Sequence, residues 1–366
     1  MSNQKKYRFL FAGGGTGGHL FPAIAVADKI KMLKPEAEIL FVGSRNKIEG
    51  TVIPKLGYKF KSIWIKGFAR RFDLENILFP LKLFVSLLQS LIINLKFKPN
   101  VAIGSGGYAA GPAIYGSHLV GTKILLLEQN SFPGVTTRLL EKYANEIHIS
   151  FKSSQKHFKN HDKLKLSGNP VRENLKLENK NGALKSFGLH TDKKTLLVIG
   201  GSLGAGSINK AVADSLEEFK KNNIQIIWQT GSNYFDTYKK FETKSVIVKA
   251  FIENMNVAYS ACDLLLARAG ATTIAEISVL GIPVILVPSP NVAENHQYFN
   301  AKSLCDDNAA VLIEDKNLKP ELIQTVKKII FNDDKLNELK KNSLRFGRPE
   351  AAMVIAESAL KFAEQE

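Results

Sequence analysis

An apolar strand, a glycine-rich turn and an apolar-periodic helix follow one another near the N-terminus, and the same succession returns just past the middle of the chain. The first instance runs from Tyr7 to Leu33 with GGGTGGH at residues 13–19, and the second runs from Thr195 to Phe219 with GGSLGA at residues 200–205. Strands that alternate with helices build parallel sheets covered by helices. The repetition therefore predicts an α/β protein of two Rossmann-like domains that face each other across a cleft.

The length of 366 residues and the hydrophobic content of 45% are enough for two domains with a core each. The strand pattern weakens near the middle, and SGNPVR at residues 167–172 is typical of a linker. We expect a first domain over residues 1–166 and a second over 167–345. The last segment, 346–366, contains an amphipathic helix from Pro349 to Phe362 that we expect to pack back on the first domain.

Further apolar runs predict the other strands of the two sheets. These runs are short and bounded by polar or glycine-containing turns, as buried strands of parallel sheets are. We place them at Ile39–Val42, Val101–Gly104, Lys123–Leu127, Ile147–Ser150, Ile224–Trp228 and Ser245–Val248.

One βαβ unit of the second domain is especially clear. Its strand, helix and second strand lie at Leu264–Leu266, Thr272–Leu280 and Ile282–Val287. Ligands of open parallel sheets bind outside the carboxyl ends of the strands. Glu276 lies one helical turn after Thr272, where its carboxylate would suit the adjacent hydroxyls of a ribose. An ordinary βαβ unit whose polar residues only cap and solvate is the alternative.

The glycine turn at residues 13–19 lets backbone amides approach a phosphate or a sugar, at the positive end of the next helix. Its glycines also satisfy G-x-G-x-x-G, the fingerprint of nicotinamide-binding domains. The second strand ends in Gly43-Ser44-Arg45 rather than in the acid that binds the NAD ribose, although an arginine suits NADP. An NADP-dependent reductase therefore stays an alternative, and it explains only this turn.

Two residues beside strand ends are candidates for a general base. His19 follows the first glycine turn directly, and its ordinary pKa lies close to neutrality. Glu128 follows the strand at 123–127 and is the rival, although a carboxylate needs a raised pKa to be an effective base. A histidine that only caps or packs is the alternative for His19.

Residues 66–98 carry two apolar stripes at helical spacing together with basic residues. The longest uncharged run, Leu83–Leu95, is well short of the roughly 20 residues that span a bilayer. One stripe can face the core, and the other predicts shallow attachment to an anionic membrane surface. The alternative is a doubly covered pair of core helices. We expect the attachment to involve Arg70, Arg71, Phe79, Lys82, Leu83 and Leu87.

The formal net charge of +16 predicts attraction to anionic partners. Nucleic acid is not expected, because zinc-finger spacing, RNP-like aromatics and a dense basic arm are missing from the sequence. The two cysteines and the short apolar run at the N-terminus favour a reducing, cytosolic location without a secretory signal. Two glycine-rich domains across a cleft suit a reaction between a nucleotide-activated donor and a second substrate. Because the sequence contains no D-x-D motif, we expect a leaving diphosphate to be stabilised by amides near Gly201 and Ser202 rather than by a metal.

Eight motifs, taken together and in order, resemble the MurG family of bacterial GT-B glycosyltransferases and cover nearly the whole chain. They are GGGTGGHLFPA, SGGYAAGP, LEQN, GNPVR, GGSLGA, FIENM, RAGATTIAE and ENHQYFNA. The resemblance implies inverting transfer of N-acetylglucosamine from UDP-GlcNAc to the MurNAc 4-hydroxyl of undecaprenyl-diphosphate-MurNAc-pentapeptide. It converts lipid I into lipid II for peptidoglycan synthesis, and so serves cell wall biogenesis, cell shape and cell division. It also implies a peripheral protein at the cytoplasmic face of the cell membrane that needs no cofactor and no metal.

The resemblance also implies site residues. Donor contacts would come from Thr16, Gly17, Gly18, Asn130, Arg172, Ser202, Ile252, Ala271, Thr272, Thr273, Ile274, Ala275, Glu276 and Gln297. The acceptor side would be formed by Gly14, Gly15, Gly106, Gly107 and Tyr108. Departures from the family pattern are Leu127 for a histidine, Leu203 for a glutamine and His296 for a glutamine, which affect individual contacts there.

Two further alternatives belong to other classes of protein. A UDP-GlcNAc 2-epimerase shares the two-domain architecture and the donor, but it does not explain the basic and apolar segment at 66–98. A non-catalytic, membrane-bound nucleotide sensor would keep Glu276 and Arg172 yet need neither His19 nor Asn130.

Overall fold

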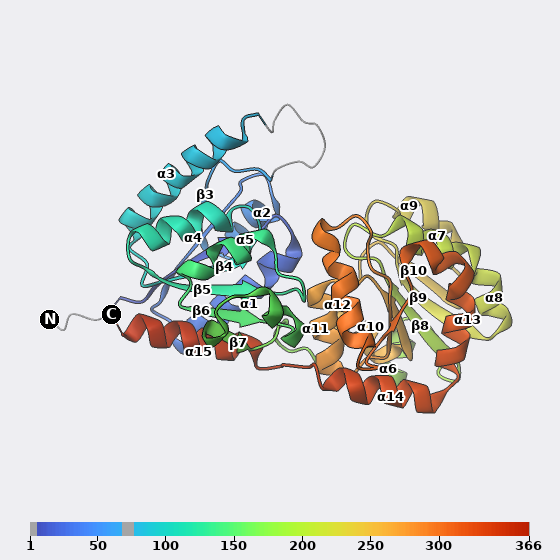
Figure 1. The fold of residues 1–366 in the computed structure, drawn as a ribbon. Coiled ribbons are helices and arrows are strands. Elements are labelled where there is room, and N and C mark those ends of the chain that lie inside the picture. The colour runs from blue at the N-terminus through green and yellow to red at the C-terminus, as the bar shows by residue number, and fades with distance from the viewer. Residues whose placement is uncertain (1–5, 68–76, 366) are drawn as a thin grey trace. The chain divides into compact units, whose positions relative to one another are not determined.

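The computed structural model of the chain describes residues 6–67 and 77–365. The chain divides into two compact units, drawn in Figure 1. The first comprises Met1–Glu173 with Arg348–Glu366, and the second comprises Asn174–Gly347. Each unit contains one parallel sheet covered by helices, which confirms the predicted pair of Rossmann-like α/β domains.

The sheet of the first unit has seven parallel strands in the order β3-β2-β1-β4-β5-β6-β7. The strand order reverses beside β1, and such a switch point is where open α/β sheets bind ligands. The strands are β1 (Arg8–Gly13), β2 (Glu38–Gly43), β3 (Lys59–Ser62), β4 (Val101–Gly106), β5 (Lys123–Glu128), β6 (Glu146–Ile149) and β7 (Leu164–Leu166). The sequence did not predict β3 and β7, which are short, mostly exposed and interrupted by lysines.

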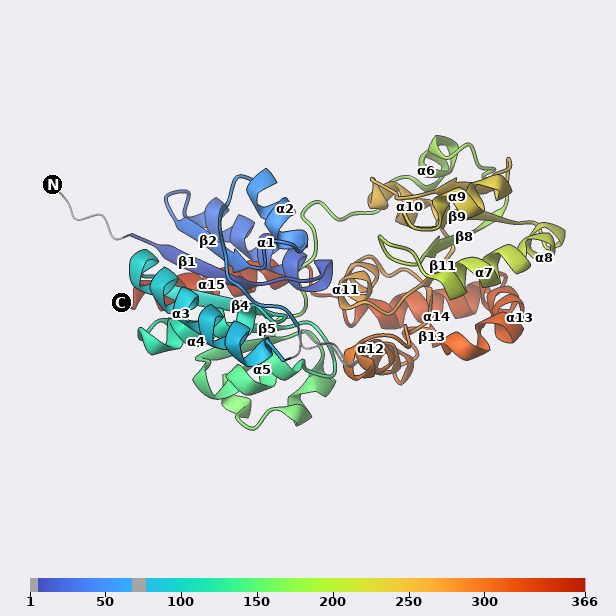
Figure 2. The same ribbon diagram turned by 90° about the horizontal axis from the view of Figure 1, so that it is seen from above.

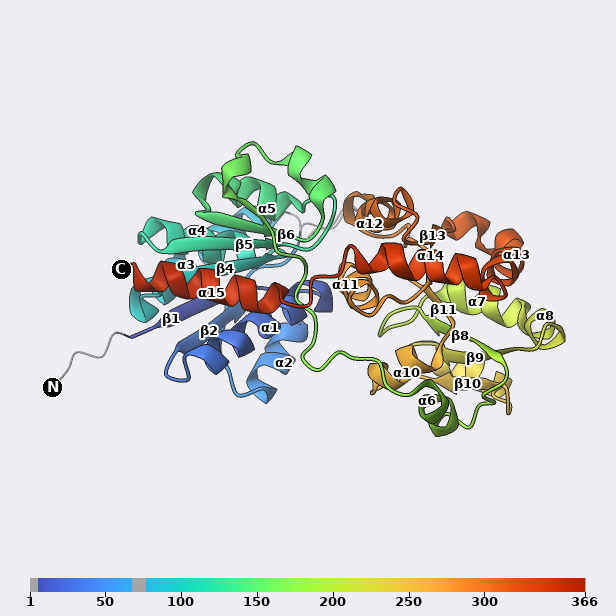
Figure 3. The same cartoon turned by 90° about the horizontal axis from the view of Figure 1, so that it is seen from below.

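Helices cover both faces of this sheet, because every central strand is apolar on both sides. Helices α1 (Gly17–Leu33), α2 (Ile48–Lys55) and α15 (Ala351–Glu364) share one core with the sheet. Helices α3 (Phe79–Phe97), α4 (Ala110–Leu119) and α5 (Val135–Leu140) complete the unit. Figure 3 shows α15 lying beside α1, so the C-terminal helix does pack on the first unit.

Helix α1 begins at Gly17, inside the glycine turn, earlier than the start at Ile24 that the apolar spacing after Pro22 predicts. Pro22 lies inside it, and the only helical bond that a proline there forgoes is the one to the Gly18 carbonyl. His19 therefore stands on the first turn of a long helix rather than in the loop before it. Because the helix starts early, Gly17, Gly18 and His19 belong to its first turn, and Thr16 immediately precedes it.

The first unit extends to Glu173, past the predicted boundary at residue 166. The amide of Gly168 donates to the Ile149 carbonyl at 3.2 Å, and Nδ1 of His148 lies 3.1 Å from Ser167 Oγ. These bonds tie the first residues of the SGNPVR segment to β6. The chain therefore leaves the first unit only after them.

The sheet of the second unit has six parallel strands in the order β10-β9-β8-β11-β12-β13. They are β8 (Lys194–Ile199), β9 (Ile224–Gln229), β10 (Val246–Lys249), β11 (Leu264–Ala267), β12 (Val284–Leu286) and β13 (Val311–Leu312). The helices are α6 (Lys180–Ser186), α7 (Gly206–Asp214), α8 (Leu216–Lys221), α9 (Phe235–Tyr238), α10 (Met255–Ala261), α11 (Ala271–Leu280), α12 (His296–Cys305), α13 (Leu318–Ile330) and α14 (Asp333–Leu344). Short 3-10 helices lie at Glu141–Tyr143, Lys152–His157, His161–Lys163, Lys239–Phe241, Ala293–Asn295 and Asp315–Asn317.

The apolar spacing after the GGSLGA turn predicts one helix from Ile208 to Phe219, but the structure has two helices, α7 and α8, which meet at Ser215. The Ser215 amide donates to the Val212 carbonyl at 3.0 Å, a bond of the tighter 3-10 type. Helix α11 ends where predicted, because Gly281 adopts a left-handed conformation with φ 67°.

Helix α3 turns polar side chains inward and apolar side chains outward. Its buried residues are spaced four apart on one face: Lys82, Ser86, Ser90 and Asn94. The exposed large apolar residues are Leu81, Leu83, Phe84, Leu88, Ile92 and Leu95. Figure 2 shows α3 and α4 side by side at the outside of the first unit. An ordinary surface helix has the opposite arrangement.

Contact with α4 explains why the polar face is buried. A Cβ at Gly116 would lie 3.0 Å from Ser90 Cβ, so the two helices approach more closely than large side chains allow. Ser117 Oγ donates to Asn94 Oδ1 at 2.7 Å, and Ser90 Oγ donates to the Ser86 carbonyl at 2.6 Å. The polar groups are thus hydrogen-bonded, and the leucines remain on the outside.

This arrangement corrects the predicted outward stripe of the segment. Phe79 packs against the core of the first unit, and Leu83 and Leu87 lie at the border of the exposed face. Lys82 is 9% exposed, with its Nζ over the Trp64 ring at 5.8 Å from the centroid. Arg70 and Arg71 lie outside the described residues. The spacing of the two apolar stripes did not reveal that the face packed against α4 is the polar one, with Ser86, Ser90 and Asn94.

Replacing Gly116 should therefore destabilise the first unit. A leucine there must push α3 away from α4, and overpacking of this kind costs about 1 to 3 kcal/mol. Gly111→Ala in the same helix is the matched control, because its Cβ meets only Thr136 Cγ2 at an ordinary 3.9 Å. Urea unfolding followed by circular dichroism measures both. Equal stability of Gly116→Leu and Gly111→Ala would contradict the close packing.

Candidate active site

Two glycine turns touch each other at the carboxyl ends of β1 and β4, in the first unit. A Cβ at Gly107 would lie 2.5 Å from the Gly14 carbonyl oxygen, and one at Gly13 would lie 1.9 Å from Ser105 Oγ. Gly107 has φ 84°, a conformation that other residues rarely adopt. The turns therefore pack backbone on backbone, and the predicted acceptor-side residues Gly14, Gly15, Gly106 and Gly107 do come together.

Glu49, which the sequence did not single out, holds the first turn in place. Its carboxylate is 1% exposed and accepts hydrogen bonds from the amides of Gly15 at 2.8 Å and Ser44 at 2.9 Å. A Cβ at Gly14 would lie 2.3 Å from the Glu49 carboxyl carbon. This carboxylate therefore requires glycine at position 14. The one signal in the sequence was an acid shortly after the second strand.

His19 lies on the first turn of α1 with its imidazole against the second glycine turn. A Cβ at Gly106 would lie 2.8 Å from Nδ1 of His19, so only glycine leaves room for the ring. Nδ1 lies 3.1 Å from Gln129 Oε1. Burial lowers the pKa of His19, which favours the neutral imidazole, against the opposing effects of Gln129, the Ser105 backbone and Glu49. A neutral, half-buried imidazole at a strand edge can accept a proton.

Glu128 is bound to its own loop. Its Oε1 accepts from the Asn130 amide at 3.0 Å, and its Oε2 accepts from the Gly134 amide at 3.0 Å. Burial raises the pKa of Glu128, and hydrogen bonds to Asn130, Thr137 and Gly134 oppose that rise. Both carboxylate oxygens serve the loop that leads into α5. This geometry favours His19 over Glu128 as the group that accepts a proton.

In the second unit, helix α11 starts at the carboxyl end of β11 and carries the predicted residues Ala271 to Glu276. Glu276 is 4% exposed, and its Oε2 accepts a hydrogen bond from the Tyr259 hydroxyl at 2.8 Å. Thr272 Oγ1 is buried without a hydrogen-bond partner. A buried polar atom of this kind at a helix start is consistent with a ligand that completes the site.

The glycine turn after β8 is exposed around Ser202. Gly201 and Gly204 have φ 92° and 86°, and a Cβ at Gly204 would lie 2.1 Å from the Thr230 carbonyl oxygen. Gln229 connects this turn to the FIENM loop, because its Nε2 donates to the Gly201 carbonyl at 3.2 Å and its Oε1 accepts from the Ile252 amide at 2.9 Å. The predicted residues Ser202 and Ile252 thus belong to two loops joined by one side chain.

Other predicted residues have mainly structural contacts. Gln297 Oε1 accepts from the Ser289 amide at 2.9 Å and shapes the loop before α12. Asn130 Nδ2 donates to Glu128 Oε1 at 3.4 Å. Arg172 and Tyr108 are exposed, and both belong to the first unit. Arg268, which the sequence placed in the turn after β11, donates to Ser207 Oγ at 2.8 Å and to Asp315.

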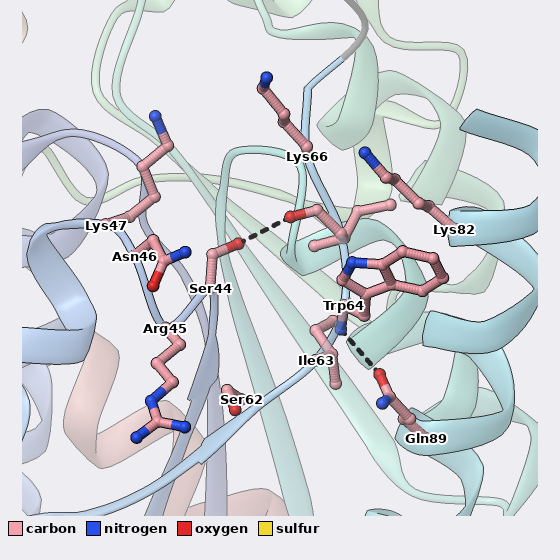
Figure 4. Close-up of a pocket in the computed structure, with 11 residues that line it drawn as sticks. Ser44, Arg45, Asn46, Lys47, Ser62, Ile63, Trp64, Lys66, Lys82 and Gln89 are labelled. Atoms are coloured by element: carbon pink, nitrogen blue, oxygen red, sulfur yellow. Dashed lines mark hydrogen bonds between the residues drawn. The ribbon is translucent and has the colours of Figure 1, made fainter. Parts of the chain in front are cut away.

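A pocket of about 590 Å³ opens in the first unit beyond the carboxyl ends of β2 and β3 (Figure 4). Four cationic side chains line it: Arg45, Lys47, Lys66 and Lys82. Ser44 Oγ donates to the Ile65 carbonyl at 3.1 Å, and the Trp64 amide donates to Gln89 Oε1 at 2.7 Å. These bonds connect the loop after β2 with the segment after β3 and with α3. The sequence did not predict this pocket.

Within the described part of the chain, no cluster of three or more His, Cys, Asp or Glu is placed to hold a metal ion. Among the described helices, α3 alone is long and apolar enough to cross a membrane by length and composition. Its buried polar face against α4 ties it to the first unit instead.

Comparison with known proteins identifies both halves of the chain. Residues 9–149 match the glycosyltransferase family 28 N-terminal domain, and residues 195–355 match the glycosyltransferase family 28 C-terminal domain. Over 353 residues, 96% of this chain and 95% of the relative, the chain is 42% identical to the UDP-N-acetylglucosamine--N-acetylmuramyl-(pentapeptide) pyrophosphoryl-undecaprenol N-acetylglucosamine transferase of Cytophaga hutchinsonii. The transferase of the same name from Flavobacterium psychrophilum is 40% identical over 365 residues, 99% of either chain.

Solved structures show the same fold. The crystal structure of Acinetobacter baumannii MurG superimposes with a TM-score of 0.78 at 24% identity, covering 97% of this chain and 99% of that chain. A UDP-GlcNAc 2-epimerase from Neisseria meningitidis superimposes with a TM-score of 0.66 at 13% identity, covering 97% and 100%. At these identities both likenesses concern the fold alone.

Glu49→Gln should destabilise the first unit. A glutamine amide has one acceptor oxygen for the two backbone N–H groups, and its own NH₂ faces the second N–H. That buried N–H is left without an acceptor, at a cost of about 1 to 3 kcal/mol. Glu36→Gln makes the same chemical change at an exposed position and should have little effect. Thermal unfolding of both variants decides the matter, and equal melting temperatures would show that the carboxylate does not brace the turn.

Proposed function

The chain belongs to glycosyltransferase family 28, and we propose that it carries out the reaction of its bacterial relatives, the transfer of N-acetylglucosamine from UDP-GlcNAc to undecaprenyl-diphosphate-MurNAc-pentapeptide. The identity of 42% over nearly the full length of both chains is the observation that carries this conclusion. The product is lipid II, the precursor of peptidoglycan. The motif resemblance seen in the sequence and the family assignment agree.

The donor would bind the second unit through the start of α11 and the two loops joined by Gln229. Glu276 lies one turn into the helix, where its carboxylate would accept from the ribose hydroxyls. Tyr259 holds one oxygen of that carboxylate at 2.8 Å and so fixes its orientation. Amides of the glycine turn at residues 200–204 would receive the leaving diphosphate, because that turn presents exposed backbone next to the start of α7.

His19 would act as the general base. As the MurNAc 4-hydroxyl oxygen forms its bond to C1 of the sugar, the bond from C1 to the diphosphate oxygen breaks and the hydroxyl proton moves to the imidazole. Burial lowers the pKa of His19, so the ring is neutral and able to accept at pH 7. The two glycine turns beside it would hold the diphosphate of the acceptor.

The outer face of α3 would attach the protein to the cytoplasmic side of the cell membrane. Its exposed leucines, isoleucine and phenylalanine form a continuous apolar surface, with Phe84 60% and Ile92 51% exposed. The cationic pocket lies at the N-terminal part of this helix, where Lys82 and Gln89 reach it (Figure 4). Apolar side chains beside cations suit shallow insertion among anionic headgroups.

An assay of UDP release from UDP-GlcNAc in the presence of a lipid I analogue tests the proposed reaction. Release that requires the lipid supports transfer, whereas conversion of UDP-GlcNAc without acceptor would indicate an epimerase. Activity should persist in EDTA, as expected if backbone amides rather than a cation stabilise the diphosphate. Loss of turnover in EDTA that Mg²⁺ restores would contradict the metal-independent mechanism.

Glu276→Ala should weaken UDP binding by about 1.5 to 3 kcal/mol, the usual loss for a hydrogen bond to a charged group. Calorimetry with UDP measures the change, and circular dichroism checks that the variant is folded. Glu253→Ala removes an exposed carboxylate of the FIENM loop and serves as the control. Unchanged UDP affinity in Glu276→Ala would remove this residue from the donor site.

His19→Ala should lower kcat by at least about 100-fold, within the range that positioned bases contribute. UDP affinity should stay nearly constant, because the donor binds the second unit. Glu128→Gln should affect thermal stability more than kcat, since Glu128 braces a loop. If instead His19→Ala keeps its kcat and the folded Glu128→Gln loses it, Glu128 is the base.

The double variant Phe84→Ser, Leu88→Ser should bind anionic vesicles at least about tenfold more weakly, because two large apolar side chains no longer insert. Cosedimentation measures binding, which should also fall at high salt. Val354→Ser, a similarly exposed position on α15, is the control. Equal sedimentation of both variants would show that α3 is not the attachment surface.

A further inference from the structure

Gln129 is buried beside the proposed base and has no role in the reaction as described so far. It directly follows Glu128 at the carboxyl end of β5 and is 2% exposed. Successive residues of a strand point to opposite sides. Glu128 braces the loop that precedes α5, while Gln129 reaches the imidazole of His19 on α1.

The orientation of the Gln129 amide is set by its own backbone neighbour. Its Nε2 donates to the Leu127 carbonyl oxygen at 3.3 Å. A carbonyl oxygen can only accept, so the NH₂ group must face Leu127. The amide oxygen Oε1 is then left on the side of the histidine ring, 3.1 Å from Nδ1 of His19.

An oxygen acceptor at Nδ1 determines where the neutral imidazole carries its single proton. Because Oε1 has no hydrogen to donate, Nδ1 must bear the hydrogen and donate it. The backbone of Ser105, on β4, is a second hydrogen-bonding group at the ring, and Glu49 on α2 is the charged group that acts on it. Nε2 is therefore left with its lone pair.

We propose that Gln129 is a positioning residue that fixes His19 in the Nδ1–H tautomer and so keeps Nε2 as the proton acceptor for the attacking hydroxyl. The catalytic consequence rests on the proposed role of His19 as base, whereas the tautomer itself does not. A hydrogen bond to one ring nitrogen sets the state and the direction of the other. The opposite tautomer would point an N–H at the hydroxyl and could not accept its proton.

Nitrogen NMR of the protein labelled at histidine tests the tautomer directly. The His19 signals are assigned by their loss in His19→Ala. The folded protein should show a protonated Nδ1 and an unprotonated Nε2 for His19 near pH 7. A protonated Nε2 in the unmodified protein would overturn the proposal without any measurement of activity.

Two substitutions separate positioning from packing. Gln129→Met keeps the length of the side chain but removes the acceptor, so His19 should shift toward the Nε2–H form and kcat should fall about 10- to 100-fold with little change in the KM for UDP-GlcNAc. Gln129→Glu keeps an oxygen at Nδ1 and adds a negative charge. It should preserve the tautomer and raise the pKa of His19, which moves the acid limb of the kcat/KM profile to higher pH.

Gln225→Met is the matched control for loss of a buried amide. Gln225 is fully buried in the second unit and bonds the backbone of His190 at 3.0 and 2.7 Å, so its loss should lower stability but leave the His19 tautomer and the pH profile unchanged. An unchanged tautomer in Gln129→Met, or an acid limb that Gln129→Glu does not move, would refute the positioning role. A tautomer that shifts as expected while His19→Ala keeps its kcat would confirm the positioning and refute only the assignment of the base.

Discussion

The contact of two glycine turns, backbone against backbone, is the constraint on which the first unit's site depends. Gly107 sits on the carbonyl of Gly14, and Gly106 leaves the space that the His19 ring occupies. A single Cβ at any of these positions would collide with main chain or with the ring. The carboxylate of Glu49 then fixes the first turn through two amides. The same close packing of the two turns also holds the imidazole of His19 in one place.

Glu128, the last residue of β5, and Gln129, which follows it, contact different parts of the first unit because successive side chains of an extended chain point to opposite sides. Glu128 uses both oxygens to hold the loop before α5, and Gln129 turns to the other side and contacts His19. A buried carboxylate with a raised pKa would suit a base by itself, yet its oxygens are already bound. The contacts of its two oxygens with the loop before α5, rather than its pKa, are the reason that we propose His19 and not Glu128 as the base.

Helix α3 exposes apolar side chains because its polar face is the one that packs on α4. Its serines and asparagine lie against α4, where small residues allow close approach and every polar group finds a partner. The leucines are then necessarily outside, although a soluble surface gains nothing from them. Inverted polarity of this kind requires a partner helix with glycine and serine at the contact, as α4 provides with Gly116 and Ser117.

The sequence by itself determined the α/β class, the two Rossmann-like units, most strands and the family, because alternating apolar runs and glycine turns are local patterns. It also identified His19 and Glu128 as candidates for the general base, because both lie beside the ends of predicted strands. It did not reveal Glu49 or Gln129, whose roles arise from residues 34 and 110 positions away. It did not show that α3 packs on α4 through its polar face, because periodicity records the apolar stripes of a helix and not which face a neighbouring helix covers. Only tertiary packing decided those points, since a hydrogen bond across strands depends on register and sheet order rather than on spacing along the chain.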